Sequence, residues 1–446
     1  MLIEFKVSNY RSIAEEQILS LIPASKQKDY TENIIEKGKY KALNALSLYG
    51  SNSGGKSNIL KSMSLLDRMI HMSARASSTT KLPHDPFLLK EGYNEKPTAF
   101  EISFIIEESR YRYGFEFNET HIEKEWLFRK NIGREVVLFE RENDIIDVSS
   151  GFNGTKKIID AAIEATRDNA LFLSTCDMLN IDEAKEIINW FSRFSMVDGL
   201  NTDREEIQTV ELWQKEEYRE KIRNYLKSLQ LGITDMDIAT KKFDISELPS
   251  DMPFGMKEKL AKSLDGKETY TVFAEHVVYD NDQKPTGKTQ TWKWEERESS
   301  GAKKALQLSG PILWTLANGG VLIIDEIEAK LHPIMTLNTI EAFLNKESNP
   351  NNAQLIFATH DTNLLSYAKL RRDQICFAEK NKYESTEIYA LSDFIYFDKN
   401  NDSKSEKERP DTDKEKRYFE GRYGAIPVLG EFQTFLRNTS WQKEEQ

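Results

Sequence analysis

The sequence predicts an α/β fold that carries an additional antiparallel β layer and a helical insertion. Two continuously apolar segments, VLIIDE (321–326) and AQLIFATH (353–360), are typical of parallel strands that are buried on both faces. Between residues 98 and 139, short apolar and aromatic segments predict a meander of antiparallel strands. From about 155 to 232 the apolar residues recur at helical spacing.

The N-terminal part is expected to contain strands around one long helix. Residues 2–7 alternate apolar and polar and predict a strand, with 18–24 as its hairpin partner. Residues 45–49 predict a strand, and the apolar residues of 58–73 predict a helix that packs one face on a sheet. The antiparallel meander of 98–139 follows.

The rest of the chain is expected to be helical first and then α/β. The apolar residues of 204–231 form one helical stripe, and 269–294 predict a β-hairpin. Helices over 306–320 and 336–346 then alternate with the two buried strands. Residues 399–417 are almost wholly polar and charged, which predicts a flexible loop.

These patterns predict four segments. Residues 1–154 form the N-terminal lobe of a head domain, and 155–265 form the helical insertion. Residues 266–398 complete the head as its C-terminal lobe. Residues 399–446 comprise the charged loop and a segment that packs back onto the body.

The composition is that of a soluble globular protein. The chain has 446 residues, of which 39% are hydrophobic and 30% charged, with a formal net charge of −12. This charge argues against a protein that coats nucleic acid indiscriminately. The basic pairs are expected to lie on solvated faces, namely Lys241–Lys242, Lys303–Lys304 and Arg371–Arg372.

The cysteines and the N-terminus predict a cytoplasmic protein. Cys176 and Cys376 are far apart and lack metal-ligand spacing, so both thiols are expected to be packed in a reducing compartment. The first residues do not form a secretory signal, and no apolar run approaches the roughly 20 residues of a membrane span.

A glycine-rich loop follows the strand of residues 45–49. GSNSGGKS (50–57) satisfies the pattern G-x-x-x-x-G-K-[ST], which predicts a P-loop NTPase. Its glycines let backbone N–H groups wrap a phosphate, and the following helix N-terminus adds its dipole. We expect Lys56 to neutralise the β- and γ-phosphates of ATP and Ser57 to ligate Mg²⁺. The predicted nucleotide-binding residues are Gly50, Asn52, Gly54, Gly55, Lys56 and Ser57; the alternative is a flexible loop.

The strand VLIIDE supplies the acidic partner that such a loop needs. Asp325 can hold the Mg²⁺ shell, and Glu326 can orient or deprotonate the attacking water. The alternative is a strand end whose two acids merely face solvent.

Two further positions follow an order known from one class of ATPase. Ser300 and Gly301 stand at the expected start of a helix 24 residues before Asp325, and His360 ends a buried strand 35 residues after it. This order of P-loop, Ser-Gly, Asp-Glu and His resembles the ATP-binding-cassette (ABC) ATPases. The resemblance implies that Ser300 and Gly301 contact the γ-phosphate held by the other subunit, while His360 senses the phosphate within its own. Alternatively, Ser300 is only a helix N-cap and His360 a satisfied core histidine.

More of the chain resembles the small prokaryotic ATPases of the OLD/RecF-like, AAA-type branch, which includes RloA and the AriA subunit of an anti-phage system. The signature departs from that of ABC transporters, because Ala302 stands at the second glycine. The resemblance implies that Asn9 to Ser12 lie near the nucleotide base and that the residues after Glu326 form a dimer-contacting D-loop. The stretches that carry it include FKVSNYRSI (5–13), YGSNSGGKSNIL (49–60), NGGVLIIDEIEAKLHP (318–333), NAQLIFATHDTNLL (352–365), LRRDQICFAEK (370–380) and KRYFEGRYGAIP (416–427).

The nuclease domain of the larger OLD relatives is not expected here. That Toprim domain needs an Asp-x-Asp pair after an apolar strand, whereas only 86 residues follow His360 and their Asp411-Thr-Asp413 lies in the charged loop. The glycines and Pro427 of EGRYGAIP (420–427) predict a rigid turn, either structural or a partner surface.

Together these features predict an Mg²⁺-dependent ATPase that works as a homodimer or higher homo-oligomer. Two heads would sandwich ATP, and the assembly would act as a sensor that controls a separate Toprim- or nuclease-like effector in anti-phage defence. A RecF-like DNA-repair clamp, a nuclease subunit and a scaffold that uses ATP only structurally are the alternatives. Nucleic-acid binding has no support from charge, and no membrane partner is expected.

Overall fold

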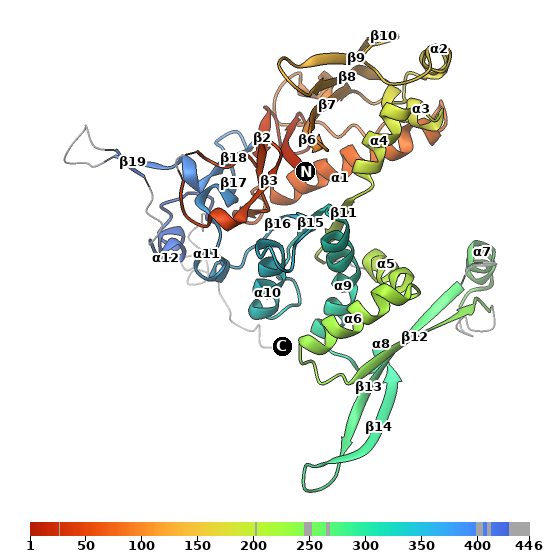
Figure 1. Ribbon diagram of the computed structural model, residues 1–446, viewed down its shortest axis with the longest axis vertical. Coiled ribbons are helices and arrows are strands. Elements are labelled where there is room, and N and C mark those ends of the chain that lie inside the picture. Colours follow the sequence, from red (N-terminus) through yellow and green to blue (C-terminus); the bar gives the residue numbers. More distant parts are fainter. Residues whose placement is uncertain are drawn as a thin grey trace, which may run out of the picture. The chain divides into compact units, whose positions relative to one another are not determined.

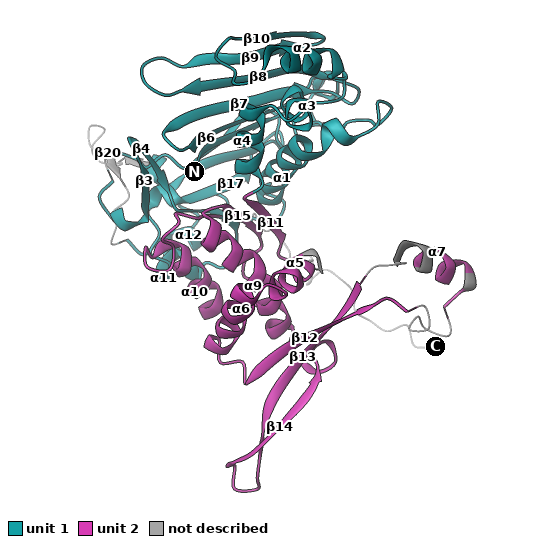
Figure 2. Ribbon diagram, turned by 45° about the vertical axis from the view of Figure 1, so that its right-hand side comes forward, with its two compact units in different colours: residues 1–192, 356–446 teal, residues 193–355 magenta. Residues whose placement is uncertain are grey.

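The computed structural model describes residues 1–427 except 26, 201–202, 245–251, 265–267, 398–404 and 408–411. The chain forms two compact units (Figure 2). Unit 1 comprises residues 1–192 and 356–446, and unit 2 comprises residues 193–355. The predicted division into head lobes and a helical insertion stays a prediction.

The antiparallel layer predicted from the sequence is the larger sheet of unit 1. Its seven strands run in the order β10-β9-β8-β7-β6-β1-β2, and all neighbours are antiparallel (Figure 1). The expected hairpin partner of the first strand is confirmed, with Phe5 opposite Leu19. The strands are β1 (Leu2–Ser8), β2 (Gln17–Ser20), β6 (Thr98–Ile106), β7 (Ser109–Phe117), β8 (Ile122–Lys130), β9 (Val136–Glu142) and β10 (Ile145–Val148).

A second group of strands in unit 1 carries the glycine-rich loop. β5 (Ala45–Tyr49) is parallel to β17 (Ile375–Lys380), which is antiparallel to β18 (Thr386–Ala390). The strand predicted at residues 45–49 is confirmed as β5, and all five of its residues are buried. The long helix α1 (Lys56–Met72) follows the loop. It buries one apolar face, which confirms its predicted packing: Ile59, Leu60, Met63, Leu65, Leu66, Met69 and Ile70.

Shorter elements complete unit 1. The hairpin β3 (Ile34–Lys37) and β4 (Tyr40–Leu43) precedes β5, and β19 (Ile395–Phe397) pairs with β20 (Ser405–Lys407). The remaining helices are α2 (Lys156–Ala165), α3 (Phe172–Met178), α4 (Asp182–Phe191), α11 (Asn363–Tyr367) and α12 (Lys414–Phe419).

Unit 2 contains a parallel strand pair, a helical layer and a three-stranded sheet. β11 (Phe194–Asp198) is parallel to β15 (Val321–Asp325), with Asp198 opposite Asp325. The strand β16 (Gln354–Ala358) begins at the end of unit 2 and ends in unit 1. The helices are α5 (Asp203–Trp213), α6 (Glu216–Ser228), α7 (Phe254–Leu264), α8 (Trp294–Arg297), α9 (Ser300–Asn318) and α10 (Pro333–Leu344).

The predicted hairpin of 269–294 is confirmed as a projecting arm. β13 (Glu268–Tyr279) and β14 (Pro285–Lys293) pair antiparallel, and β12 (Asp235–Lys242) adds a third strand on the other side of β13. Within unit 2 the hairpin extends away from α6 and α9 (Figure 1). We call β13 and β14 with their connecting turn the arm.

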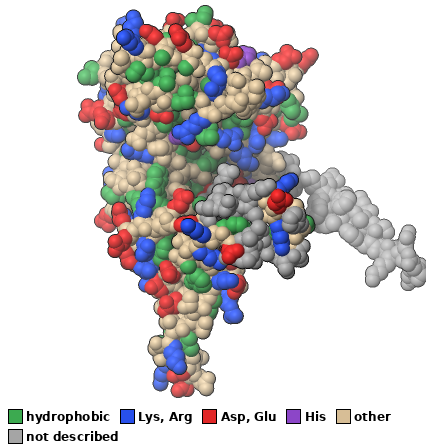
Figure 3. All heavy atoms as spheres, turned by 90° about the vertical axis from the view of Figure 1, so that its right-hand side faces the viewer, with side chains coloured by type: hydrophobic (Ala, Val, Ile, Leu, Met, Phe, Trp, Pro, Cys, Tyr) green, Lys and Arg blue, Asp and Glu red, His purple; other side chains and the backbone are tan. Residues whose placement is uncertain are grey.

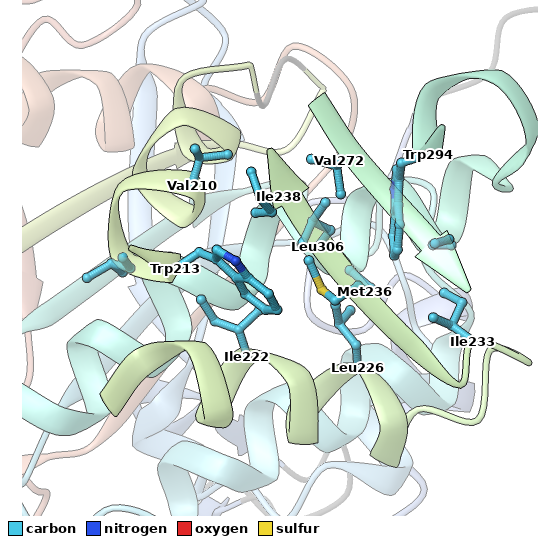
Figure 4. Close-up of a cluster of buried hydrophobic side chains, with 14 residues drawn as sticks. Val210, Trp213, Ile222, Leu226, Ile233, Met236, Ile238, Val272, Trp294 and Leu306 are labelled. Carbon is cyan, nitrogen blue, oxygen red and sulfur yellow. The ribbon is translucent and has the colours of Figure 1, made fainter. Parts of the chain in front are cut away.

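A hydrophobic cluster joins the base of the arm to the helices of unit 2 (Figure 4). Trp213 and Ile222 come from α5 and α6, Met236 from β12, Trp294 from α8 and Leu306 from α9. Trp294 is among the largest fully buried side chains. Because the cluster draws on all of these elements, the arm base and the start of α9 share one core.

Some sequence predictions need correction. The single stripe of 204–231 is two helices, α5 and α6, because the chain turns at Gln214 and Lys215; Ile207 of the predicted stripe is 49% exposed. The strand β11 lay within the region predicted to be helical. Lys304 and Arg371 were expected on solvated faces but are buried, with 1% and 0% exposure.

Other predictions fall on residues that the structure does not cover. Parts of the charged segment 399–417, and the residues after 427 that were expected to pack onto the body, lie outside the described residues.

Both cysteines are buried and free. In the described part of the chain, no helix is long and apolar enough to cross a membrane.

Candidate nucleotide-binding site

The glycine-rich loop forms the strand–loop–helix unit that a phosphate site requires. β5 ends at Tyr49, and α1 begins at Lys56. Gly55 caps α1 with φ of 104° and ψ of 0°, a left-handed conformation that residues with a side chain rarely adopt. The Gly54 N–H donates to the Ser51 carbonyl oxygen at 3.0 Å, which tightens the turn before the helix.

The loop glycines are also required by close packing within unit 1. A Cβ on Gly50 would lie 2.2 Å from the carbonyl oxygen of Ala378, and one on Gly54 would lie 2.7 Å from the same atom. A Cβ on Gly55 would lie 2.0 Å from Thr386 Oγ1. Therefore β17 and β18 clamp the loop from one side, and the glycines permit this close approach.

The lysine of the motif lies folded along the loop. Lys56 is 5% exposed, and its Nζ donates to the carbonyl oxygens of Gly50 at 2.7 Å and Ser51 at 3.1 Å. This keeps the ammonium at the phosphate-binding loop, where P-loop chemistry needs its charge. Asn52 is exposed and Ser57 half-buried, so both lie at the open side of the loop.

Ser12 connects the N-terminal turn to the loop. Its Oγ lies 2.8 Å from Thr386 Oγ1 and accepts from Asn58 Nδ2 at 2.8 Å. Thr386 Oγ1 in turn donates to the Gly54 carbonyl oxygen at 3.2 Å. These bonds involve both ends of the chain and fix the first turn of α1.

The resemblance placed Asn9 to Ser12 near the base of the nucleotide. Asn9 is 3% exposed, and its amide donates to Tyr93 and Lys96 while accepting from the Phe87 N–H. Asn9 therefore serves to hold the segment 87–97. Arg11 is exposed and bonds Asp85 through Nε at 2.8 Å, so it is the member of this turn whose charged group reaches solvent.

The segment of His360 also lies beside the strand that precedes the loop. The Thr359 N–H donates to the Leu48 carbonyl oxygen at 3.1 Å, two residues before Gly50. His360 is exposed, so the alternative of a buried core histidine does not hold. Its predicted role as a phosphate sensor stays a prediction.

The EGRYGAIP segment packs into unit 1 behind the loop. Tyr423 is fully buried, its carbonyl oxygen accepts from Tyr389 Oη at 2.8 Å, and the Ala425 N–H donates to Glu379 at 2.7 Å. The ring of Tyr418 contacts that of Tyr49, with centroids 6.2 Å apart. These contacts favour the structural interpretation of the segment over a partner surface.

The acidic residues are at the carboxyl end of β15, in unit 2. Asp325 Oδ1 is buried and has no hydrogen-bond partner among the described residues. A buried carboxylate oxygen is normally satisfied, so an orphaned one fits a ligand to Mg²⁺ or its water shell. Glu326 follows with φ of 51°, a strained conformation for a residue with a side chain that is frequent at functional sites.

Gly199 allows a close approach to these two acids. Its N–H donates to the Asp325 carbonyl oxygen at 2.8 Å, and a Cβ on Gly199 would lie 2.1 Å from that oxygen. The same Cβ would lie 2.4 Å from the Glu326 carbonyl oxygen. The strained turn at Glu326 is therefore held by the backbone that follows β11.

The start of α9 lies beside the segment after Glu326. Ser299, not Ser300, is the N-cap, because its Oγ accepts from the Ala302 N–H at 3.1 Å. Ser300 is left exposed. A Cβ on Gly301 would lie 3.2 Å from the carbonyl oxygen of Lys330, so α9 begins against the predicted D-loop.

Sequence reasoning missed Lys304, one turn further along α9. Its Nζ donates to the Gly199 carbonyl oxygen at 2.5 Å, and burial lowers the pKa of Lys304 to about 8, partly offset by Glu205. Lys304 thus joins α9 to the residue that bonds Asp325. The only sequence signal was its place one turn after Ser300 and Gly301.

A family model matches more than half of the chain. The family described as "AAA domain, putative AbiEii toxin, Type IV TA system" matches residues 46–161 and 222–366, more than half of the chain, and the chain belongs to that family. The matched residues include the P-loop, Asp325, Glu326 and His360. The fold is mixed α/β with an antiparallel β layer, and the matched part of the chain is an AAA-type domain that contains the P-loop.

Several solved structures are similar to the chain at low identity. The SMC head domain from Thermotoga maritima is 11% identical, covering 87% of this chain and 98% of its own, with a TM-score of 0.38. The recombination mediator protein RecF-ATPrS in the RecFOR pathway is 14% identical, with the same coverage and a TM-score of 0.29. An Smc head domain with a coiled coil and joint from Pyrococcus yayanosii is 10% identical, covering 88% and 97%, with a TM-score of 0.34. The comparison with curated proteins found no match.

Proposed function

We propose that the chain binds and hydrolyses ATP as a head-to-head pair, and that the bound state of this pair controls a separate effector protein in anti-phage defence. Family membership and the P-loop geometry support nucleotide binding. The paired arrangement and the effector are the part of the proposal that family membership and the P-loop geometry do not themselves establish. The description of the family as a putative toxin of a toxin–antitoxin system favours a defence role over DNA repair.

The roles of the residues follow from their chemistry. Gly50, Asn52, Gly54 and Gly55 shape the phosphate loop, and Lys56 neutralises phosphate charge. Ser57 and Asp325 would hold Mg²⁺, which supplies further charge neutralisation when bound. Glu326 orients or deprotonates the attacking water, and His360 senses the γ-phosphate. The residues that a second copy would lend are Ser300 and Gly301.

One observation carries the paired arrangement. Within unit 2, the exposed Ser300, the close contact of Gly301 with Lys330 and the turn at Glu326 lie together. The signature and the predicted D-loop therefore present one continuous surface. Such a surface suits a nucleotide held by another copy of the chain, which a closed two-fold pair would bring.

Two variants test the proposal. Lys56→Ala is expected to abolish ATP binding, measured by equilibrium titration with a labelled nucleotide. Glu326→Gln is expected to bind ATP, lose turnover on the order of 100-fold or more and accumulate as a nucleotide-bound pair in light scattering. Full ATPase activity in Lys56→Ala would refute the site.

The control of an effector is tested separately, with the product of a gene adjacent to the gene of this chain. Association in a pull-down should require ATP, persist with Glu326→Gln and be lost with Lys56→Ala. Association that is equal for all three proteins would refute ATP control.

A further inference from the structure

The chain just before α9 is fastened to the arm through one carboxylate. Glu298 Oε1 accepts a hydrogen bond from Trp292 Nε1 at 2.8 Å and lies 2.9 Å from His276 Nε2. His276 is on β13 and Trp292 on β14, so one oxygen contacts both strands of the arm. We call these three residues the clasp.

The clasp is more buried than a surface ion pair. The rings of His276 and Trp292 stack with centroids 4.2 Å apart and an angle of 18°. The Glu298 side chain is 7% exposed, whereas that of Glu296, in the nearby pair with Lys293, is 59% exposed. Because a carboxylate removed from water is unfavourable unless it is hydrogen-bonded, Glu298 has a strong preference for this position.

The position of Glu298 in the chain matters for the site. Glu298 directly precedes the N-cap Ser299, and Ser300 and Gly301 follow at once. On the other side of these residues, Lys304 bonds Gly199, whose N–H bonds Asp325. The signature segment is therefore held at both of its ends by buried charged side chains.

These contacts form a continuous series within unit 2. The series runs from the arm through Glu298 to the first turn of α9, and from Lys304 through Gly199 to the end of β15. The hydrophobic cluster adds rigidity, since Trp294 and Leu306 pack in the same core (Figure 4).

We propose that Glu298 is a positioning residue that sets the signature Ser300 and Gly301 by fastening them to the base of the arm. The proposal rests on the proposed function, because it assigns Glu298 to the part of the site that acts on the partner's nucleotide. It predicts that the clasp affects pairing and turnover, but not the binding of ATP to the P-loop of unit 1.

The test compares Glu298→Ala with Glu296→Ala. Glu296 is a matched control because it lies three residues before the same N-cap, Ser299. Glu298→Ala is expected to lower ATP turnover and ATP-dependent pairing about tenfold, the effect of one hydrogen bond to a charged group. The affinity of the isolated subunit for ATP, measured below the pairing concentration, should stay unchanged. Glu296→Ala should resemble the wild type throughout.

Two further variants separate positioning from folding. Glu298→Gln keeps an oxygen that can accept from Trp292, so it should recover part of the lost turnover. Trp292→Phe removes that donor but keeps an aromatic ring beside His276, and it should also lower turnover. Both can be examined if Glu298→Ala fails to fold.

The outcomes distinguish this proposal from the broader one. If folded Glu298 variants match Glu296→Ala in turnover and pairing, the positioning role is refuted while the ATPase stands. If Glu298→Ala weakens the ATP affinity of the isolated subunit as much as its turnover, the role is also refuted, because the defect is then not confined to the signature. If the wild type shows neither turnover nor ATP-dependent pairing, the proposed function itself fails.

Discussion

The predicted site residues of unit 1 and those of unit 2 are held in different ways. In unit 1, the P-loop is held by its backbone, with Gly50 and Gly54 packed against the Ala378 carbonyl oxygen. At these two glycines there is no room for a Cβ atom. In unit 2, the predicted signature residues Ser300 and Gly301 are flanked by two buried polar side chains, Glu298 and Lys304. This second arrangement depends on the identity of side chains.

This difference predicts different responses to mutation. Steric changes should damage unit 1, where a Cβ meets backbone that cannot rotate away. Changes of charge should damage unit 2 at Glu298 and Lys304, where they remove a hydrogen bond but leave the packing intact. The following substitutions test that contrast, beginning with the largest expected effect.

Gly50→Ala should have the largest effect. The new Cβ would lie 2.2 Å from the carbonyl oxygen of Ala378 and the backbone is at a φ of 155°, so β5 or β17 must shift. We expect a loss of roughly 2–4 kcal/mol in the free energy of unfolding of the protein and a loss of ATP binding. Urea unfolding and nucleotide titration measure the two effects. Gly133→Ala, at a glycine with nothing within 4 Å, is the control for a left-handed position without contacts.

Unlike Gly50→Ala, Lys304→Met should lower ATP turnover without lowering the stability of the protein. Methionine fills a similar volume and removes a buried charge whose lowered pKa of about 8 marks it as unfavourable in the folded state. The bond to Gly199 is lost, so turnover should fall roughly tenfold with an unchanged or higher melting temperature. Lys303→Met, at the neighbouring half-exposed lysine, should leave turnover unchanged. A Lys304→Met protein with normal turnover would contradict the side-chain account of unit 2.

The stability difference between the wild type and Lys304→Met should depend on pH. In the folded protein Lys304 loses its proton at about pH 8, whereas in the unfolded chain it keeps the proton up to its ordinary pKa of 10.5. Between these values the unfolded state binds more protons, so the wild type gains stability relative to the variant as pH rises. Unfolding titrations at pH 7 and pH 10 measure the gain. A stability difference that is the same at both pH values would indicate that burial does not lower the pKa of Lys304.

Arg11→Ala should have the smallest effect on stability. Arg11 forms an exposed ion pair with Asp85, with side chains 38% and 52% exposed, and such pairs contribute about 0–1 kcal/mol. If Arg11 lies near the nucleotide base, ATP affinity should nevertheless fall. Asp85→Ala is the matched control, since it breaks the same ion pair but keeps the arginine.

The sequence predicted most of unit 1 and less of unit 2 for a physical reason. Motifs such as the P-loop and VLIIDE are local, so adjacent residues contain their chemistry. The supports of the site are not local: Ser12 bonds Thr386 over 374 positions, and Lys304 bonds Gly199 over 105. Both Lys303 and Lys304 were expected to face solvent, but Lys304 is buried. Composition cannot tell which lysine of a helix faces the core. From the sequence, Ser300 was considered as the N-cap of α9, whereas the N-cap is Ser299. Either serine could cap the helix, so the sequence alone does not distinguish them.

The central claim is that two copies of the chain complete each ATP site, and mixing two inactive variants tests it directly. Lys56→Ala disables the P-loop, and Ser300→Arg blocks the signature that would act on the partner's nucleotide. In a mixed pair, the intact P-loop of one subunit meets the intact signature of the other, so an equimolar mixture should recover about one quarter of the wild-type turnover. A mixture of folded, exchanging subunits that stays as inactive as each variant alone would contradict the claim.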